Sequence, residues 1–155
     1  MGSDPTASEL LDRGIRLLDA GHYTDSVRNL QSSYDMDPSS VQCLSYLGLA
    51  IALGNKNYRE AEELCREAIR KQFYQSEFYH NLGLVYLASK QRGLAVRALR
   101  KGLKMDPSNQ DIQDTLEEIG TRSRPLLAFL SRDHFLNHKL GKLAAQYFGR
   151  HKRKT

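Results

Sequence analysis

The small and hydrophobic residues of this chain repeat with a period of 34 or 35 positions. Each period has a glycine, an apolar residue three positions later, and then a small and a further apolar residue. The four sets are Gly14, Gly48 and Gly83; Leu17, Ile51 and Tyr86; Ser26, Ala61 and Ala95; and Leu30, Cys65 and Leu99. Because the sets recur in phase, the pattern predicts three copies of one structural unit.

Each unit is predicted to be a pair of antiparallel helices joined by a short turn. Its glycine falls inside the first helix, where glycine costs about 1 kcal/mol relative to alanine, so its recurrence indicates close approach of a second helix. The predicted partners on the second helix are the small residues Ser26, Ala61 and Ala95. Residues that tolerate turn conformations lie between the helices at 20–23, 54–58 and 90–93.

Proline and helix-capping residues mark the ends of the units. Asp37-Pro38 and Asp106-Pro107 end the first and third units, because proline cannot continue a helix. Ser39-Ser40 and Ser108-Asn109 follow, and these residue types cap the start of a helix. The second unit has Gln72-Phe73 where Asp-Pro is expected, so the same rules do not define the geometry of its exit.

The repeat resembles the tetratricopeptide-repeat family, whose helix-turn-helix units are 34 residues long. The resemblance covers about residues 7–107 and includes the glycines, the Asp-Pro ends and the alanines at 61, 68 and 95. Tyr23 and Tyr58, which follow the turns, also match the family pattern. Arg13, Ser26 and Ser33 depart from it, so the first repeat matches the family pattern least well.

The resemblance implies an all-α fold, a right-handed α-α superhelix of three repeats at about residues 7–40, 41–75 and 76–109. Residues 109–121 place Ile112, Leu116 and Ile119 on one helical face and are expected to form a capping helix. The predicted domain therefore spans residues 7–121, followed by a C-terminal extension at 122–155.

In this family the first helices of successive repeats line a concave groove that binds extended peptides or partner helices. The resemblance assigns to this groove Leu11, Ile15, Gln42, Tyr46, Leu49, Leu53, Glu77, His80, Asn81 and Leu84. Since the set is largely apolar, we expect an amphipathic helix or hydrophobic peptide anchored by Tyr46, Leu49 and Leu84. Tyr46, His80 and Asn81 are expected to be exposed in the groove.

Some members of the family hold the C-terminal carboxylate of chaperones with Lys, Asn and Arg side chains on these helices. The corresponding positions here hold Leu11, Ile15, Tyr46 and Glu77, and only Asn81 could serve. We therefore do not expect this chain to capture chaperone tails.

The charge is unevenly distributed along the chain. The formal net charge is +5, but residues 122–155 contain nine Lys/Arg and one acid, which leaves a mildly acidic body. This asymmetry bears on partners rather than on fold. The cations of the extension that are candidates for binding are Arg132, Lys139, Lys142, Arg150, Lys152, Arg153 and Lys154.

Residues 122–155 are predicted to contain a basic amphipathic helix, with Leu136, Leu140, Leu143 and Tyr147 at helical spacing, and a disordered end. Three interpretations stay open. The apolar face docks onto the repeats or into their groove, or the helix binds a partner protein or a second copy of the chain. In the third, the cations contact nucleic acid or an anionic membrane.

No residue pattern supports catalysis, a metal site or a cofactor. Phosphate-binding loops, the nucleophile elbow and the zinc-protease motif are all missing from the sequence. His134 and His138 lie four positions apart but have no evident third ligand beyond Asp133. Cys43 and Cys65 are single and are expected to be reduced core residues.

The predicted function is that of a non-catalytic adaptor or scaffold, which binds a protein or peptide in the concave groove. The alternative is an electrostatic tether, in which the extension binds nucleic acid or an anionic membrane while the repeats recruit a protein. A polar N-terminus and the lack of a run of about 20 apolar residues predict a soluble, cytoplasmic protein.

Overall fold

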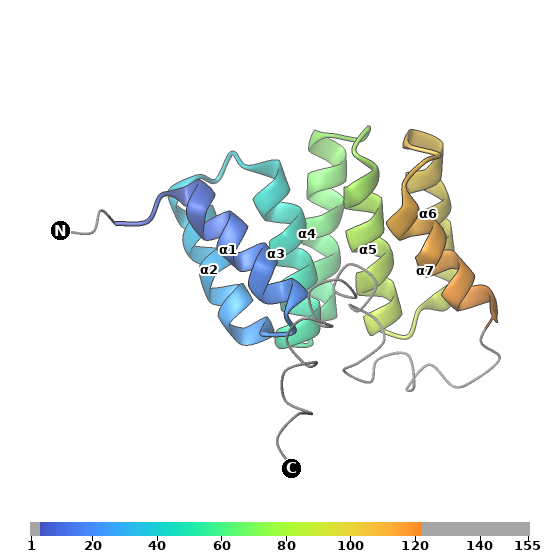
Figure 1. Cartoon of the computed structure of the whole chain (residues 1–155), viewed down its shortest axis with the longest axis horizontal. Helices are drawn as coiled ribbons and strands as arrows, with labels where there is room; N and C mark the ends of the chain where they lie inside the picture. The colour runs from blue at the N-terminus through green and yellow to red at the C-terminus, as the bar shows by residue number, and fades with distance from the viewer. Residues whose placement is uncertain (1–3, 122–155) are drawn as a thin grey trace, which may run out of the picture.

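A computed structural model describes residues 4–121 and contains seven helices in that range (Figure 1). They are α1 (Ala7–Asp19), α2 (Tyr23–Met36), α3 (Val41–Gly54), α4 (Tyr58–Lys71), α5 (Ser76–Ala88), α6 (Arg92–Met105) and α7 (Gln110–Thr121). The described residues contain no strand, so the predicted all-α fold is confirmed. Helices α1 to α6 form three antiparallel hairpins, and α7 packs against the last of them.

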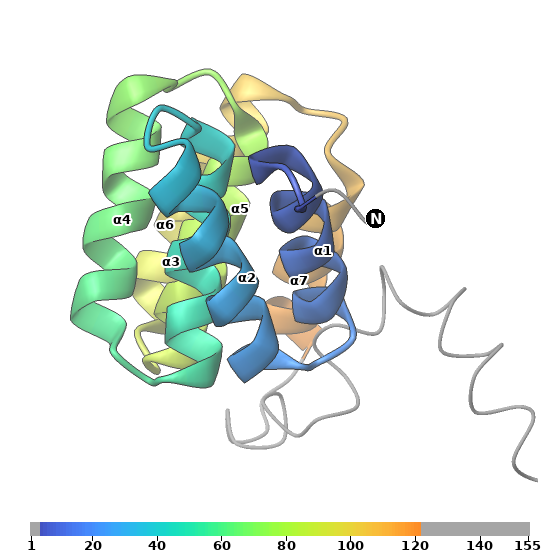
Figure 2. The same cartoon turned by 90° about the vertical axis from the view of Figure 1, so that its left-hand side faces the viewer.

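The hairpins stack so that their first helices form an inner layer and their second helices an outer layer. In Figure 2, α1 and α7 project beyond α3 and α5, so the inner layer is concave. Helices α3 and α5 bury ten residues each, whereas α4 and α6 bury three and four. The core therefore lies along α3 and α5, which neighbouring helices cover on several sides.

The recurring glycines are points of close helix contact, as predicted. A Cβ atom added to Gly48 would lie 2.7 Å from Cys65 Sγ and 2.8 Å from the Ala61 carbonyl oxygen. At Gly14 and Gly83 the added atom would meet the side chains of Leu30 and Leu99, respectively. The residue facing the glycine is thus at one repeat position in all three hairpins, one helical turn beyond the predicted small partner.

The first repeat replaces two alanines of the family pattern with buried serines whose hydroxyls bond backbone carbonyls. Ser26 Oγ donates to the Gly14 carbonyl at 2.8 Å, and Ser33 Oγ donates to the Ala7 carbonyl at 2.7 Å. These bonds satisfy the two hydroxyls inside the α1–α2 interface. The first repeat therefore keeps the helix packing of the others with a different chemistry.

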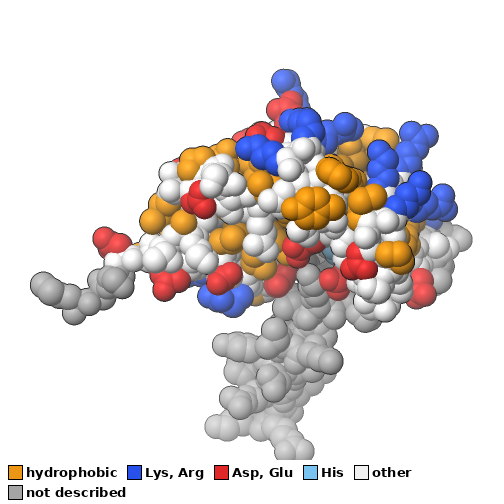
Figure 3. Space-filling model, turned by 90° about the horizontal axis from the view of Figure 1, so that it is seen from above, with side chains coloured by type: hydrophobic (Ala, Val, Ile, Leu, Met, Phe, Trp, Pro, Cys, Tyr) orange, Lys and Arg blue, Asp and Glu red, His pale blue; other side chains and the backbone are white. Residues whose placement is uncertain are grey.

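The predicted helix caps are confirmed, and the bounds of the predicted turns are corrected. The Ser40 side chain accepts from the Cys43 N–H, and Asn109 Oδ1 accepts from the Ile112 N–H. The turns within the hairpins each contain one residue with positive φ, at Gly21, Lys56 and Lys90. Each turn is shorter than predicted, because α2, α4 and α6 already begin at Tyr23, Tyr58 and Arg92. The turns between repeats lie on the edge of the molecule opposite to the turns within the hairpins, and Figure 3 views that edge face-on.

Candidate functional site

The ten groove candidates all lie on the inner helices α1, α3 and α5, as the resemblance implies, but most of them are covered. Gln42 is exposed, and Ile15, Leu53, Glu77 and His80 are half-buried. The other five are buried: Leu11, Tyr46, Leu49, Asn81 and Leu84. The inner side therefore offers a much smaller apolar surface than the sequence predicted.

The expected exposure of Tyr46 and Asn81 is wrong, since they are only 6% and 3% exposed. The apolar anchors Leu49 and Leu84 are also buried and belong to the main hydrophobic core. The reason is the concave packing, because α3 contacts α2, α4 and α5 and so has little free face. His80 is half-buried, and the part of any of these residues in binding stays a prediction.

Polar side chains link the inner helices to one another in a series of hydrogen bonds. The Tyr46 hydroxyl of α3 donates to the Glu77 carboxylate of α5. One turn along, Asn81 Nδ2 donates to Ser45 Oγ at 3.0 Å. We call these two bonds the α3–α5 polar contact. Because the Asn81 and Ser45 side chains are buried, the contact fixes how two repeats stack.

A third bond extends this series to the last helix. His80 Nε2 lies 3.0 Å from Thr115 Oγ1, which itself donates to the Asp111 carbonyl at 2.7 Å. Thr115 and Asp111 are not among the groove residues predicted from the sequence. The repeat period could have found them, because Asp111 stands 34 positions after Glu77 and Thr115 stands 34 after Asn81. The capping helix thus continues the polar positions of the repeats.

The inner side has an acidic character around Tyr46. Burial raises the pKa of the Tyr46 hydroxyl, and the negative charge of Glu77 raises that pKa further. Asp19 of α1 and Asp111 of α7 act in the same direction, so carboxylates from three helices, α1, α5 and α7, influence one buried hydroxyl. Ionisation of a phenol beside carboxylates is unfavourable, so the Tyr46 hydroxyl stays neutral and acts as a hydrogen-bond donor.

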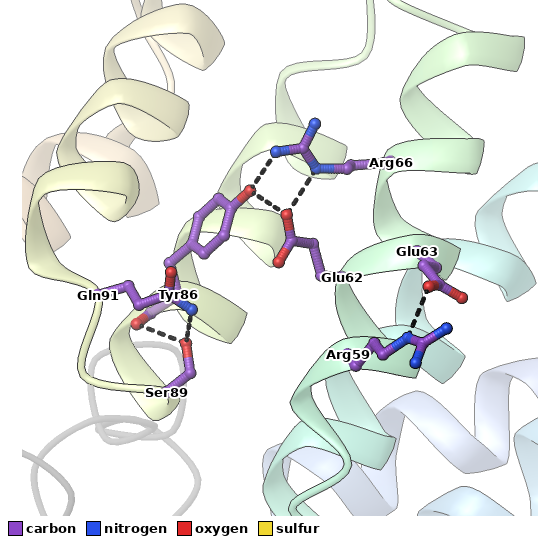
Figure 4. Close-up of polar contacts among 7 residues, drawn as sticks. All are labelled: Arg59, Glu62, Glu63, Arg66, Tyr86, Ser89 and Gln91. Atoms are coloured by element: carbon purple, nitrogen blue, oxygen red, sulfur yellow. Dashed lines mark hydrogen bonds and ion pairs between the residues drawn. The ribbon is translucent and has the colours of Figure 1, made fainter.

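A second polar cluster connects the outer helix α4 to the inner helix α5 (Figure 4). The Tyr86 hydroxyl donates to Glu62 Oε1 at 2.8 Å and accepts from Arg66 Nη2 at 2.9 Å, while Arg66 Nε donates to Glu62 at 2.8 Å. Its bond to Tyr86 raises the pKa of Arg66, which keeps the guanidinium charged. The neighbouring Arg59–Glu63 ion pair is exposed and joins residues of α4 only.

Both cysteines lie in the core, where the sequence placed them. Cys43 Sγ is 3.3 Å from the Leu30 carbonyl oxygen, and Cys65 Sγ is 3.5 Å from that of Ser45. Burial raises the pKa of the Cys65 thiol to about 12 and also raises that of Cys43. Neither thiol has the lowered pKa of a nucleophile, so their role here is packing.

Stacked helical hairpins of one repeated pattern, with a concave inner layer, define a helical-repeat scaffold of the solenoid class. Two tetratricopeptide-repeat family models match the chain, one over residues 11–76 and the other over residues 76–109. These matches together cover more than half of the sequence, so the chain belongs to the tetratricopeptide-repeat family.

Among solved structures, the chain is similar to the first tetratricopeptide-repeat domain of human RPAP3, with a TM-score of 0.63 and 19% identity over 83% of this chain and 98% of that one. It is also similar to the first such domain of Spaghetti (RPAP3) bound to the HSP90 peptide SRMEEVD, with a TM-score of 0.60 and 20% identity over 74% and 90% of the two chains. At these identities the likeness shows the fold alone.

A curated relative from Plasmodium falciparum, the Hsp70-Hsp90 organising protein, is 25% identical over 76% of this chain and 22% of its own length. The NAA15 auxiliary subunit of the N-terminal acetyltransferase A complex from Arabidopsis thaliana is 23% identical over 88% of this chain and 16% of its own length. The chain therefore spans less than a quarter of each relative.

Several sequence predictions fall outside the described residues. The basic candidates from Arg132 to Lys154, the predicted amphipathic helix and the His134–His138 pair all belong to residues 122–155. Within residues 4–121, no helix is both long enough and apolar enough to cross a membrane.

Proposed function

We propose that this protein is a non-catalytic adaptor that binds a segment of another protein on the concave side of its repeats. The observation that carries this proposal is the α3–α5 polar contact, which holds the inner helices in one arrangement. A surface whose shape exists before binding loses little entropy when a partner docks. Structures of two similar domains, described as bound to HSP90 and HSP70 peptides, support a peptide as the partner class.

The chemistry of the inner side argues against an acidic partner. Glu77, Asp19 and Asp111 make the surroundings of Tyr46 negative, and no basic clamp residue is present among the ten candidates. An acidic tail such as SRMEEVD would be repelled by these carboxylates. We therefore propose an amphipathic segment with cationic residues, which extends the apolar partner expected from the sequence.

A bulky side chain introduced on the concave side tests whether the partner binds there. Gln42 is the one exposed candidate on the inner helices, and Gln31 is an exposed glutamine on the outer helix α2, so Gln42→Trp and Gln31→Trp form a matched pair. A partner captured by the full chain should be lost with Gln42→Trp and kept with Gln31→Trp. Equal capture by both variants would contradict the proposal.

The exclusion of acidic tails has a direct measurement. Titration of the full chain with the peptide SRMEEVD should leave the backbone NMR signals of α3 and α5 unchanged, because the inner side carries carboxylates in place of a basic clamp. Saturable shifts on these helices would show that the chain binds chaperone tails after all.

The electrostatic tether remains the alternative, and it rests on residues 122–155. No observation within residues 4–121 supports binding of nucleic acid or an anionic membrane by this extension. Capture that survives Gln42→Trp but disappears with high salt or nuclease would favour the tether, because binding to phosphates is strongly salt-dependent. The cytoplasmic location also stays a prediction.

A further inference from the structure

The junction between the second and third repeats lacks a turn that the other two junctions share. At those junctions the carboxylate of Asp37 or Asp106 accepts hydrogen bonds from the backbone N–H and hydroxyl of the serine two positions later. Gln72 occupies the equivalent position between α4 and α5. In place of proline and serine, this junction carries Phe73 and Tyr74, which are 64% and 58% exposed.

The two aromatic side chains pack against each other and against little else. Their ring centroids are 5.8 Å apart and the rings are nearly perpendicular, at 83°. One exposed aromatic residue is ordinary on a protein surface, but a pair at the tip of a turn is a large projecting apolar group. Exposed aromatic groups of this kind are typical of sites that bind a partner or a lipid interface.

Helix α6, which follows in the next hairpin, is basic on its outward side. It contains five Lys/Arg and no acid. Arg97, Arg100, Lys101 and Lys104 are exposed, and none of them forms a salt bridge with another residue of the described range 4–121. The positive charge of α6 is therefore not neutralised by ion pairs within the repeats.

The aromatic turn and the basic end of α6 lie on the same edge of the molecule. A Cβ atom on Gly102 would be 3.2 Å from the Ser76 carbonyl oxygen, and Asn109 Nδ2 donates to Ser76 Oγ at 2.9 Å. Ser76 comes two residues after Tyr74, so the end of α6 packs beside the aromatic turn. In Figure 3, basic side chains gather next to hydrophobic ones on this edge. We call Phe73, Tyr74, Arg100, Lys101 and Lys104 the aromatic–basic edge.

We propose that the aromatic–basic edge binds the surface of a membrane that contains anionic lipids. Helix α6 carries four exposed cations, three of the edge and Arg97. Groups of four or more Lys/Arg on a helix are attracted to an anionic leaflet, and projecting aromatic side chains insert among its headgroups. Single-stranded nucleic acid fits less well, because the edge-to-face packing of Phe73 and Tyr74 occupies ring surface on which bases would stack.

This surface is separate from the concave side, so the proposal does not depend on the proposed function. Lys71 is left out of the edge because it pairs with Glu67 at 3.4 Å. Asp106 lies close in sequence, but its carboxylate is engaged by Ser108. The edge therefore keeps a net positive charge although Glu67 and Asp106 lie nearby, because both carboxylates are engaged by other residues.

Sedimentation of the full chain with lipid vesicles tests the proposal. We would compare vesicles of phosphatidylcholine alone with vesicles that also contain about 30% phosphatidylglycerol. The variants are Phe73→Ser with Tyr74→Ser, and Lys101→Glu with Lys104→Glu. A control with the same charge change is Arg28→Glu with Arg59→Glu, since both arginines are highly exposed and lie on α2 and α4, away from the edge.

The wild type should bind the anionic vesicles, and each edge variant should weaken this binding about tenfold, while the control stays within about twofold. Thermal melting of each variant, followed by circular dichroism, confirms folding. Equal binding by edge variants and control would overturn the proposal, because residues 122–155 are present in all of them. Binding of labelled poly(U) would be measured in parallel. If the edge variants reduced poly(U) binding but left vesicle binding unchanged, the membrane proposal would be overturned.

Discussion

The inner and outer helix layers of this protein are built from the same repeat but differ in burial and in the contacts of their polar side chains. Inner helices α3 and α5 bury ten residues each, and their polar side chains bond one another across helices. Outer helices α4 and α6 bury three and four residues. Several charged side chains of α4 pair with neighbours one turn away, and Glu62 and Arg66 also bond Tyr86 of α5. The inner helices thus supply most of the buried core, while both layers take part in stacking, since α4 of one repeat also packs against α5 of the next.

The largest difference between the layers should come from adding one methyl group. Gly48→Ala on α3 places a Cβ atom 2.8 Å from the Ala61 carbonyl oxygen, so we expect the free energy of unfolding to fall by about 1–3 kcal/mol. Gly93→Ala on α6 meets nothing within 4 Å and should raise stability by about 0.5–1 kcal/mol through helix propensity. Urea denaturation measures both, and equal effects would erase the distinction between the layers.

Removing a buried amide tests the inner polar contact. Asn81→Ala leaves the buried Ser45 hydroxyl without its donor, and we expect a loss of about 1–2 kcal/mol. Asn29→Ala on α2, whose amide bonds the Asp25 carbonyl in an exposed position, should cost less than about 0.5 kcal/mol. A double-mutant cycle of Asn81→Ala with Ser45→Ala should show coupling, and simple additivity would mean that the contact adds nothing to stacking.

Alkaline pH should destabilise the protein through buried groups of the core. The folded pKa of Cys65 is about 12 against 9.0 in the unfolded chain, so the unfolded state loses its proton first and stability falls as pH rises from 9 toward 12. The raised pKa of Tyr46 acts in the same direction at pH above 10. Cys65 alone should remove about 1.4 kcal/mol per pH unit in its window. Urea midpoints at several pH values measure this slope.

The variant Cys65→Ala tests whether the Cys65 thiol causes this fall in stability with rising pH. Cys65→Ala lowers stability at neutral pH but removes the thiol, so the fall in stability between pH 9 and pH 12 should become shallower. An unchanged slope would show that other groups produce the alkaline loss.

The smallest effects are expected for the polar contacts made by side chains of α4. Tyr86→Phe removes the hydroxyl that links Glu62 to Arg66 but keeps the ion pair, and should cost about 0.5–1 kcal/mol. Arg59→Ala breaks an exposed pair and should change stability by less than about 0.5 kcal/mol. Thermal unfolding of both variants checks the order, and a larger loss for Arg59→Ala would contradict it.

Sequence periodicity predicted the helices and their order well. The glycines at 14, 48 and 83 report close contacts that recur in each repeat. The Asp-Pro ends and the caps at Ser40 and Asn109 report local backbone geometry at the first and third repeat ends. Such signals depend on residues near one another in the chain, so one sequence is enough to locate them.

The accessibility of the candidate site could not be predicted in the same way. Tyr46 and Asn81 occupy equivalent positions in a pattern that is typical of groove residues, yet both are buried. Their burial depends on how far one repeat rotates against the next, and no local residue pattern encodes that rotation. The structure also showed Asp19 and Asp111 acting on the same hydroxyl from helices far apart in sequence.

The chain's own pattern therefore specified an all-α repeat with three hairpins and a capping helix, because periodicity and capping act over one or two helical turns. The acidic inner side, the buried polar contact between α3 and α5 and the aromatic–basic edge arise only when hairpins stack. Stacking brings together side chains that are 31 to 36 positions apart, as in the pairs Tyr46–Glu77 and Ser45–Asn81. Burial and charge act through such distances in space, which a linear pattern does not record.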